Sequence, residues 1–277
     1  MSDTEHPVSL RDAEAEDGGS WWLLPNLHDS LGDRYLSFDE HGAMVEMLRV
    51  RDTLASRPAF ADAVRQRVQE LADLRSPWIA AMQIAEADAP GPLALVSEHC
   101  ATRLVEVKTE DPATALAVLE QLLFATSKLH AAGPEVAHGA IDAVRIGLVA
   151  DGHIRLLEPV FGSAIAALSA DTERLSADEP LVTRVGQSAD VVRCARAGLS
   201  LLLGDAFAPD RPGMAAVFDE RLTGRCAPEV AAWFRRALHV EGEPWANAGH
   251  AVGALQALLA REKELTRLHD QVARERR

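Results

Sequence analysis

This chain of 277 residues is poor in the residues on which several classes of protein depend. Its three cysteines are scattered and include no C-x-x-C pair, so neither a disulfide framework nor a zinc site is predicted, and a reducing cytoplasm is the expected setting. Lys and Arg total 28 against 42 Asp and Glu, and this net charge of −14 argues against nonspecific binding of nucleic acid. No apolar run is long enough to span a membrane, and residues 1–5 lack the layout of a signal peptide.

The catalytic signatures of several enzyme classes are also missing. The sequence contains no G-x-x-x-x-G-K-S/T loop, no H-E-x-x-H and no G-x-S-x-G, and its 10 histidines are scattered, so no metal site is predicted. Aromatic residues make up only 5%, yet hydrophobic residues make up 48%, so alanine and leucine are expected to fill a sizeable core. The length suits one two-lobed domain or two small ones.

One pattern does carry chemistry. Residues 136–146, followed by residues 151–158, resemble the catalytic loop and metal-binding strand of the protein kinases, where the loop reads H-R-D-x-x-x-x-N and D-F-G follows. The resemblance places His138 at the His, Ala140 at the catalytic Asp and Arg145 at the metal-binding Asn. Glu158 stands at the D-F-G Asp, unless the strand carries an insertion and residues 160–162 take that place, which leaves no carboxylate there.

The resemblance extends to two further segments. Residues 190–204 match a buried helix of the kinase large lobe without a gap, which implies that Asp190 holds the backbone of the catalytic loop as a structural residue. Residues 93–100 resemble the strand and hinge that join the two lobes. There Ser97 takes the gatekeeper position, and Glu98 and Cys100 offer backbone groups to an adenine. ATP and Mg²⁺ are only weakly supported as ligands, because backbone groups are present whatever the side chain.

The nucleotide-clamping residues of the small lobe are altered in the same comparison. Residues 43–48 resemble the strand that carries the phosphate-binding Lys, and Glu46 replaces that Lys. Arg67 falls where the following helix has its Glu, so the ion pair would be reversed. A carboxylate facing phosphates would repel them. The alternative is that both residues are solvated charges on amphipathic elements.

The glycine-rich phosphate loop is poorly represented. Residues 31–42 occupy its expected place but hold only two separated glycines and three acids. We expect Gly32 and Gly42 to serve turns instead, where positive φ is useful.

The expected fold is α+β, a two-lobed protein-kinase-like domain with a β-rich small lobe and a mainly helical large lobe. A disordered acidic arm is predicted for residues 1–20, followed by the small lobe (21–97), the large lobe (98–260) and a helical extension (261–277), with the joint near residues 97–102. Trp21 and Trp22 either anchor the first strand, which we favour, or dock a partner. Other predicted segments are strands within 31–49 and 78–97, helices at 59–74, 111–130, 190–204 and 228–260, short β segments within 136–157, and an activation segment at 163–188.

The C-terminal segment keeps apolar residues on one helical face. Leu258, Leu265, Leu268 and Val272 share that face while charges cover the rest, a pattern that suits a protruding helix or a short coiled coil. A solvated extension of the last helix is the alternative.

These observations predict a catalytically inactive kinase-like domain, a pseudokinase of bacterial type, that acts as a regulatory, scaffolding or protein-binding module. Three losses decide this: the Lys, the catalytic Asp and the Asn each position charge or a proton in phosphoryl transfer. One rival is an atypical ATP-binding phosphotransferase or nucleotidyl-transferring enzyme with a metal site rebuilt around Glu158, Asp142 and Glu46. Another is a structural subunit that forms homo-oligomers through residues 258–272.

Overall fold

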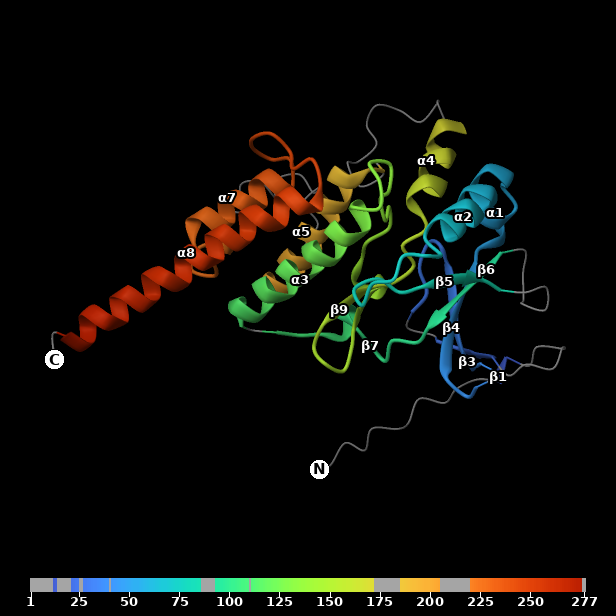
Figure 1. Cartoon of the computed structure of the whole chain (residues 1–277), viewed down its shortest axis with the longest axis horizontal. Coiled ribbons are helices and arrows are strands. Elements are labelled where there is room, and N and C mark those ends of the chain that lie inside the picture. The colour runs from blue at the N-terminus through green and yellow to red at the C-terminus, as the bar shows by residue number, and fades with distance from the viewer. Residues whose placement is uncertain are drawn as a thin grey trace. The chain divides into compact units, whose positions relative to one another are not determined.

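The computed structural model describes residues 12–13, 21–24, 27–39, 41–85, 93–109, 111–171, 185–204 and 220–275. It divides into two compact units. The first comprises residues 1–74 and 81–100, and the second residues 75–80 and 101–277. The first is built on an antiparallel sheet and the second is mainly helical, which confirms the predicted α+β class (Figure 1).

The first unit contains a six-stranded antiparallel sheet in the order β1-β2-β3-β4-β6-β5. Its strands are β1 (Asp12–Ala13), β2 (Trp21–Leu23), β3 (Gly32–Phe38), β4 (Met44–Val50), β5 (Met82–Ile84) and β6 (Ala94–Glu98). Trp22 pairs with Leu36 of β3 and its ring meets Phe38 edge-on, so the two tryptophans begin a strand as we favoured. The rest of the predicted arm, and the turn expected at residues 89–92, lie outside the described residues.

The structure corrects the expected place of the phosphate loop at residues 31–42, because most of these residues belong to β3. Residues 32–38 form a full strand, and residues 27–31 before it belong to no strand or helix. Gly42 lies in the hairpin turn with φ of 77°, as expected. Gly32 does not serve a turn: it lies in β3, where a Cβ atom would stand 2.1 Å from the Arg49 carbonyl oxygen. The residue is needed for close approach of the two backbones.

Helices α1 (Asp52–Ala55) and α2 (Pro58–Glu70) complete the first unit. Phe60 and Val64 of α2 and Met47 of β4 are fully buried, as the helical spacing of the apolar residues predicts. Helix α2 ends four residues earlier than predicted, and residues 71–73 continue as a turn.

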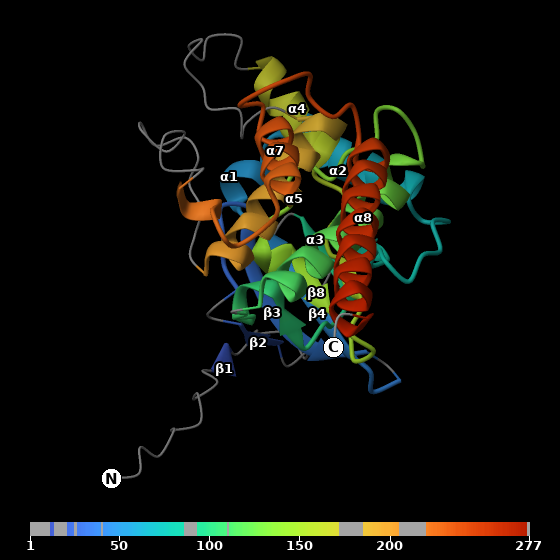
Figure 2. The same ribbon diagram turned by 90° about the vertical axis from the view of Figure 1, so that its left-hand side faces the viewer.

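The second unit is built from α3 (Pro112–His130), α4 (Gly162–Asp171), α5 (Gln187–Leu203), α7 (Pro228–Ala237) and α8 (Ala248–Glu275). Asp111 caps α3 by accepting hydrogen bonds from the backbone N–H groups of Ala113 and Thr114, and Pro112 occupies the first turn, as predicted. Helix α3 contacts both α5 and α8, and α7 contacts α8 (Figure 2).

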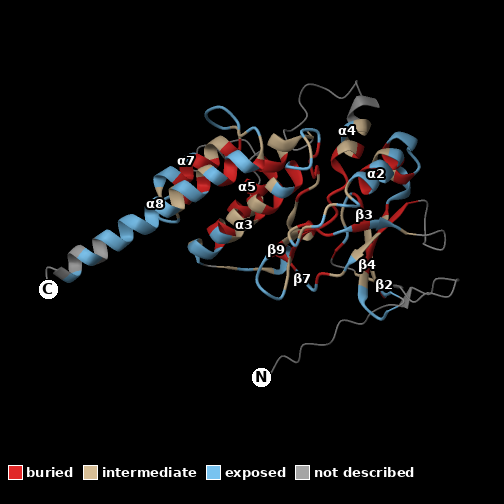
Figure 3. Cartoon of the chain, viewed as in Figure 1, coloured by how far each residue is buried: buried red, intermediate tan, exposed pale blue. Residues whose placement is uncertain are grey.

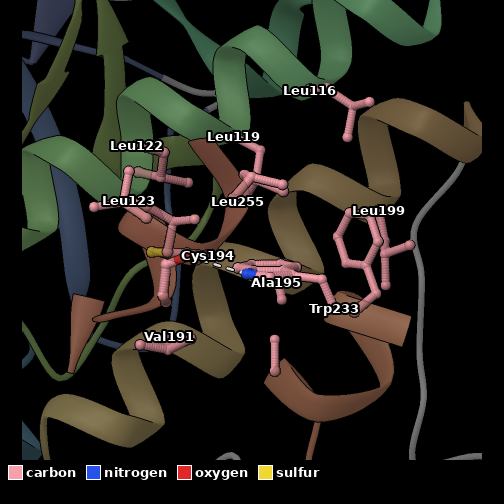
Figure 4. Packing of buried hydrophobic residues seen from close by; sticks show 14 of the residues in the cluster. Leu116, Leu119, Leu122, Leu123, Val191, Cys194, Ala195, Leu199, Trp233 and Leu255 are labelled. Carbon is pink, nitrogen blue, oxygen red and sulfur yellow. Dashed lines mark hydrogen bonds between the residues drawn. The ribbon is translucent and has the colours of Figure 1, made fainter. Parts of the chain in front are cut away.

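The core of this unit is made of leucine and alanine more than of aromatic rings. Leucines of α3 meet small side chains of α5, among them Cys194 and Ala195, and Leu255 of α8 closes the cluster (Figure 4). Trp233 of α7 is its largest ring, and its indole N–H donates to the Ala251 carbonyl over 3.0 Å. Burial raises the pKa of the Cys194 thiol to about 12, so this cysteine is a packing residue.

The second unit also contains a three-stranded sheet. Its strands β7 (Thr102–Arg103), β8 (Ile146–Leu148) and β9 (Ile154–Leu156) bring residues near the hinge beside the predicted catalytic loop and metal-binding strand. Two 3₁₀ helices, η1 (Leu104–Glu106) and η2 (Ala143–Arg145), flank them. The predicted activation segment begins as α4, and its residues 172–184 lie outside the described part of the chain.

The last helix, α8, is continuous from the core to residue 275. Its first turns are buried and its outer turns are exposed (Figure 3). The predicted C-terminal extension is therefore part of the final helix. Within the described ranges, no helix combines the length and apolar character that crossing a bilayer requires.

Candidate functional site

Asp190 organises the loop that resembles a catalytic loop. Its side chain is fully buried and accepts hydrogen bonds from the backbone N–H groups of His138, over 2.6 Å, and of Gly139, over 3.0 Å. Arg193, one helical turn further along α5, approaches the same carboxylate at 3.3 Å. Burial alone would raise the pKa of Asp190, but the hydrogen bond from His130 and the nearby guanidinium of Arg193 lower it below its usual value. The two bonds to the backbone are those that the kinase resemblance implies for Asp190.

His130 links this carboxylate to α8. The Ala248 backbone N–H donates to Nδ1 of His130 over 3.1 Å, so Nδ1 carries no proton. The proton then lies on Nε2, which donates to Asp190 over 3.1 Å. The imidazole of His130 therefore joins the end of α3, the start of α5 and the start of α8.

His138 is a buried structural histidine. Its Nε2 donates to the Leu157 carbonyl oxygen over 2.9 Å, while Nδ1 faces the Ala140 N–H at 3.3 Å. Burial lowers its pKa to about 4, so the ring is neutral at physiological pH. This bond ties the loop to the end of β9.

Arg145 and Glu158 form a buried ion pair at the metal-binding positions of the pattern. The guanidinium Nε donates to Glu158 over 2.9 Å, and both side chains are at most 4% exposed. A second arm of Arg145 contacts the carboxylate of Asp142 and donates to the Ala140 carbonyl oxygen over 3.3 Å. Glu158 directly follows Leu157 at the end of β9, which favours the alignment without an insertion.

Three features of the backbone lie around the Arg145–Glu158 ion pair. Glu158 has φ of 57°, in the left-handed region that residues with a side chain seldom adopt. Asp142 caps η2 by accepting from the N–H groups of Val144 and Arg145. Gly139 and Gly162 lie so close that a Cβ on Gly139 would stand 2.5 Å from the Gly162 Cα, so α4 begins against the loop.

The chemistry of this cluster is limited by its charges. A guanidinium cannot be deprotonated in a protein, and here it lies against the two nearest carboxylates. A divalent cation bound to those oxygens would have to displace Arg145 or share a site with its positive charge. Ala140 has no group that could accept a proton from a substrate hydroxyl.

The first unit contains a second cluster of buried charge. Arg34 of β3 is fully buried between Asp29, at 2.8 Å, and Glu46 of β4, at 3.8 Å. It also donates to the Leu27 carbonyl oxygen over 2.5 Å, which fastens the loop before β3 to the sheet. His99 approaches the other oxygen of Glu46 at 3.2 Å. Glu46 is only 4% exposed, so it is not a solvated charge.

Other predicted residues of the first unit lie near Glu46 or on α2. Ser97 of β6 is the direct cross-strand neighbour of Glu46, and Glu98 and Cys100 follow it at the end of the unit. Arg67 is buried on α2 and pairs with Glu70 at 3.1 Å. Because Glu46 contacts Arg34 and His99, the reversed Glu46–Arg67 pair stays a prediction.

Comparison with solved structures agrees with this geometry. The kinase domain of PknI from Mycobacterium tuberculosis has a TM-score of 0.60 and 14% identity, covering 86% of this chain and 95% of that one. A double mutant of the same domain gives 0.61 and 16%. The chain has a protein-kinase-like fold. The kinase domain of maize SIRK1, a sucrose-induced receptor kinase solved with AMP-PNP, gives 0.60 at 14% identity and covers 91% of this chain and 98% of that one.

Sequence comparison adds no further relative. No family model matches the chain, and no curated protein matches it. The kinase-like fold at such low identity means that the two-lobed architecture is shared while most side chains differ.

Sequence reasoning missed Arg34 and His99, which contact Glu46, and His130, which contacts Asp190. Arg34 was not singled out, although an arginine inside a strand of alternating pattern is a signal of a buried pair. The local pattern marks His130 only as a helix end and His99 as a surface residue. Their roles depend on partners 53 to 118 residues away in the chain, which local patterns do not reveal.

Proposed function

We propose that this kinase-like domain does not transfer phosphate and acts as a regulatory or protein-binding module. The observation that carries the proposal is the buried ion pair between Arg145 and Glu158, at 2.9 Å. Phosphoryl transfer uses these two positions to hold Mg²⁺, and here they satisfy each other. Ala140 at the position of the catalytic base adds a second loss, and Glu46 in place of the Lys adds a third.

Nucleotide binding is disfavoured by the same charges. A nucleotide phosphate near Glu46 would meet a carboxylate that is already shared with Arg34 and His99. The residues present do not fit Mg²⁺, since Arg145 takes up the carboxylates that would bind it. We infer that neither ATP nor Mg²⁺ is required for the domain's role and that its ligands are proteins, in the cytoplasm.

The experiment is a phosphotransfer assay paired with thermal unfolding in ATP, ADP and GTP, with and without Mg²⁺. We expect no transfer and no concentration-dependent rise of the unfolding midpoint up to millimolar nucleotide, because a ligand of the folded state must raise it. Transfer that is abolished in Glu158→Gln would overturn the proposal. Arg145→Asn is the matched variant: it frees both carboxylates, and a Mg²⁺-dependent rise of the midpoint should appear in it alone.

The rival enzyme with a rebuilt metal site makes the opposite prediction. It requires Glu158, Asp142 and Glu46 to bind a metal in the unmodified protein, although the first two contact Arg145 and Glu46 contacts Arg34. A Mg²⁺-dependent midpoint shift in the wild type, lost in Glu158→Gln, would favour the rival.

A further inference from the structure

Helix α8 consists of two halves with different surroundings. Its inner half packs in the core through Ala248, Ala251 and Leu255, and Gln256 donates to Glu120 of α3 over 3.0 Å. The outer half projects beyond the other helices of its unit (Figures 1 and 3). All residues from 260 to 268 are exposed, including Leu265 at 49% and Leu268 at 42%.

Three leucines follow a coiled-coil spacing. Leu258 and Leu265 are seven residues apart, and Leu268 follows three residues later, so they take the a, a and d positions of two heptads, with Arg261 at the d position between the first two. Leu258 is partly buried and packs against the core of its own unit, whereas Leu265 and Leu268 are exposed. An isolated helix as short as the outer half of α8 is only marginally stable in water unless its apolar face packs against another element. Such a stripe therefore indicates a partner helix.

Charge favours a second copy of the same helix. Residues 261–277 contain six Lys and Arg and four Asp and Glu, so of the 28 and 42 in the whole chain, 22 basic and 38 acidic residues belong to residues 1–260. The tail carries charges of both signs in alternation and can pair with itself, whereas two copies of the acidic body repel each other. An arrangement that joins the tails and separates the bodies satisfies both conditions.

We propose that the protein forms an antiparallel dimer through residues 258–275 of α8, with Leu265 of one copy against Leu268 of the other. An antiparallel pair directs the two acidic bodies to opposite ends. A parallel pair would hold the bodies side by side and stack Arg261 on Arg261 in the apolar seam. The proposal is independent of whether the domain transfers phosphate.

The first test is the molecular mass of the full chain across micromolar to hundreds of micromolar concentration by analytical ultracentrifugation. We expect a shift from the chain mass of 29.9 kDa to twice that value. The double variant Leu265→Gln/Leu268→Gln should weaken the dimer at least tenfold. Lys263→Gln/Arg267→Gln, on the opposite face, is the matched control and should leave it unchanged. A monomer at every concentration, or a dimer unaffected by the leucine variant, would overturn the proposal.

The second test determines the orientation. A spin label on Ala260→Cys reports the distance between the two copies. Cys226 is replaced by Ser so that the label does not attach there, and Cys100 and Cys194 stay in place because they are buried. With 1.5 Å of rise per residue, the antiparallel register separates the two labels by about 20 Å along the axis, whereas a parallel pair brings them together. A short distance would refute the antiparallel arrangement, and thermal unfolding controls for the fold of each variant.

Discussion

The two ends of the loop at residues 138–145 differ in how closely they match the kinase pattern. At residues 138 and 139, the backbone is held by the buried carboxylate of Asp190, as in the kinase pattern. At residues 140 to 145, Ala140 stands where the kinase pattern has its catalytic Asp, and Arg145 stands where it has the metal-binding Asn. Arg145 is paired with Glu158. The backbone support of the loop follows the kinase pattern, whereas the side chains of Ala140 and Arg145 depart from it. The support stabilises the fold whether or not phosphate is transferred.

The largest expected effect comes from removing the support. Asp190→Ala leaves the N–H groups of His138 and Gly139, the His130 ring and Arg193 without their shared acceptor in a fully buried site. We expect a loss of about 3–5 kcal/mol in the free energy of unfolding, measured in urea. Asp62→Ala, at an aspartate whose side chain is 76% exposed, is the control and should cost less than about 0.5 kcal/mol. A loss below about 1 kcal/mol for Asp190→Ala would contradict the role assigned to it.

Removing the cation of the Arg145–Glu158 ion pair should cost somewhat less. Arg145→Ala removes the cation beside the buried carboxylate of Glu158, and we expect a loss of about 3 kcal/mol, since Asp142 can turn to solvent. The double variant Arg145→Met/Glu158→Met should recover most of that loss, because apolar side chains of similar volume remove both charges. If the double variant is as unstable as the single one, the ion pair is not what the site depends on.

Acid should destabilise the fold by placing a charge on the buried ring of His138. The pKa of His138 is about 4 in the folded protein, below the ordinary value of 6.5, so the unfolded chain binds the proton first. Its contribution to stability is complete above pH 6.5 and is lost as the pH falls towards 4. We expect about 2 kcal/mol less stability at pH 4.5 than at pH 7 from this group. His138→Gln should flatten that part of the pH profile, and an unchanged profile would contradict the assignment.

The smallest effect is expected at Asp142, the exposed partner of Arg145. Asp142 caps η2 and its side chain is 46% exposed. Asp142→Ala should cost about 1 kcal/mol, mainly through the lost cap, as measured by urea unfolding. Asp142→Asn, which can still accept the backbone bonds, should restore most of it. Equal losses in the two variants would show that the charge on Asp142, and not the cap, is what matters.

Local patterns in the sequence predicted the elements with strong punctuation. The Asp111 cap with Pro112 set the start of α3, and the gapless match over residues 190–204 located α5. The boundaries of the small lobe were less predictable, because short strands carry few residues of alternating pattern. That is why the phosphate loop was placed over residues that form β3, and Gly32 was assigned to a turn.

The sequence by itself determined the fold class and which residues, Ala140 and Arg145 among them, stand in the loop at residues 136–146, since both are read from residue identity and near-neighbour spacing. Only the tertiary structure decided which charges are paired. Arg145 with Glu158, Arg34 with Glu46, and His130 between Asp190 and α8 depend on side chains that come together after the backbone is placed. An isolated charge in a sequence favours water, and only burial beside an opposite charge turns it into a structural residue.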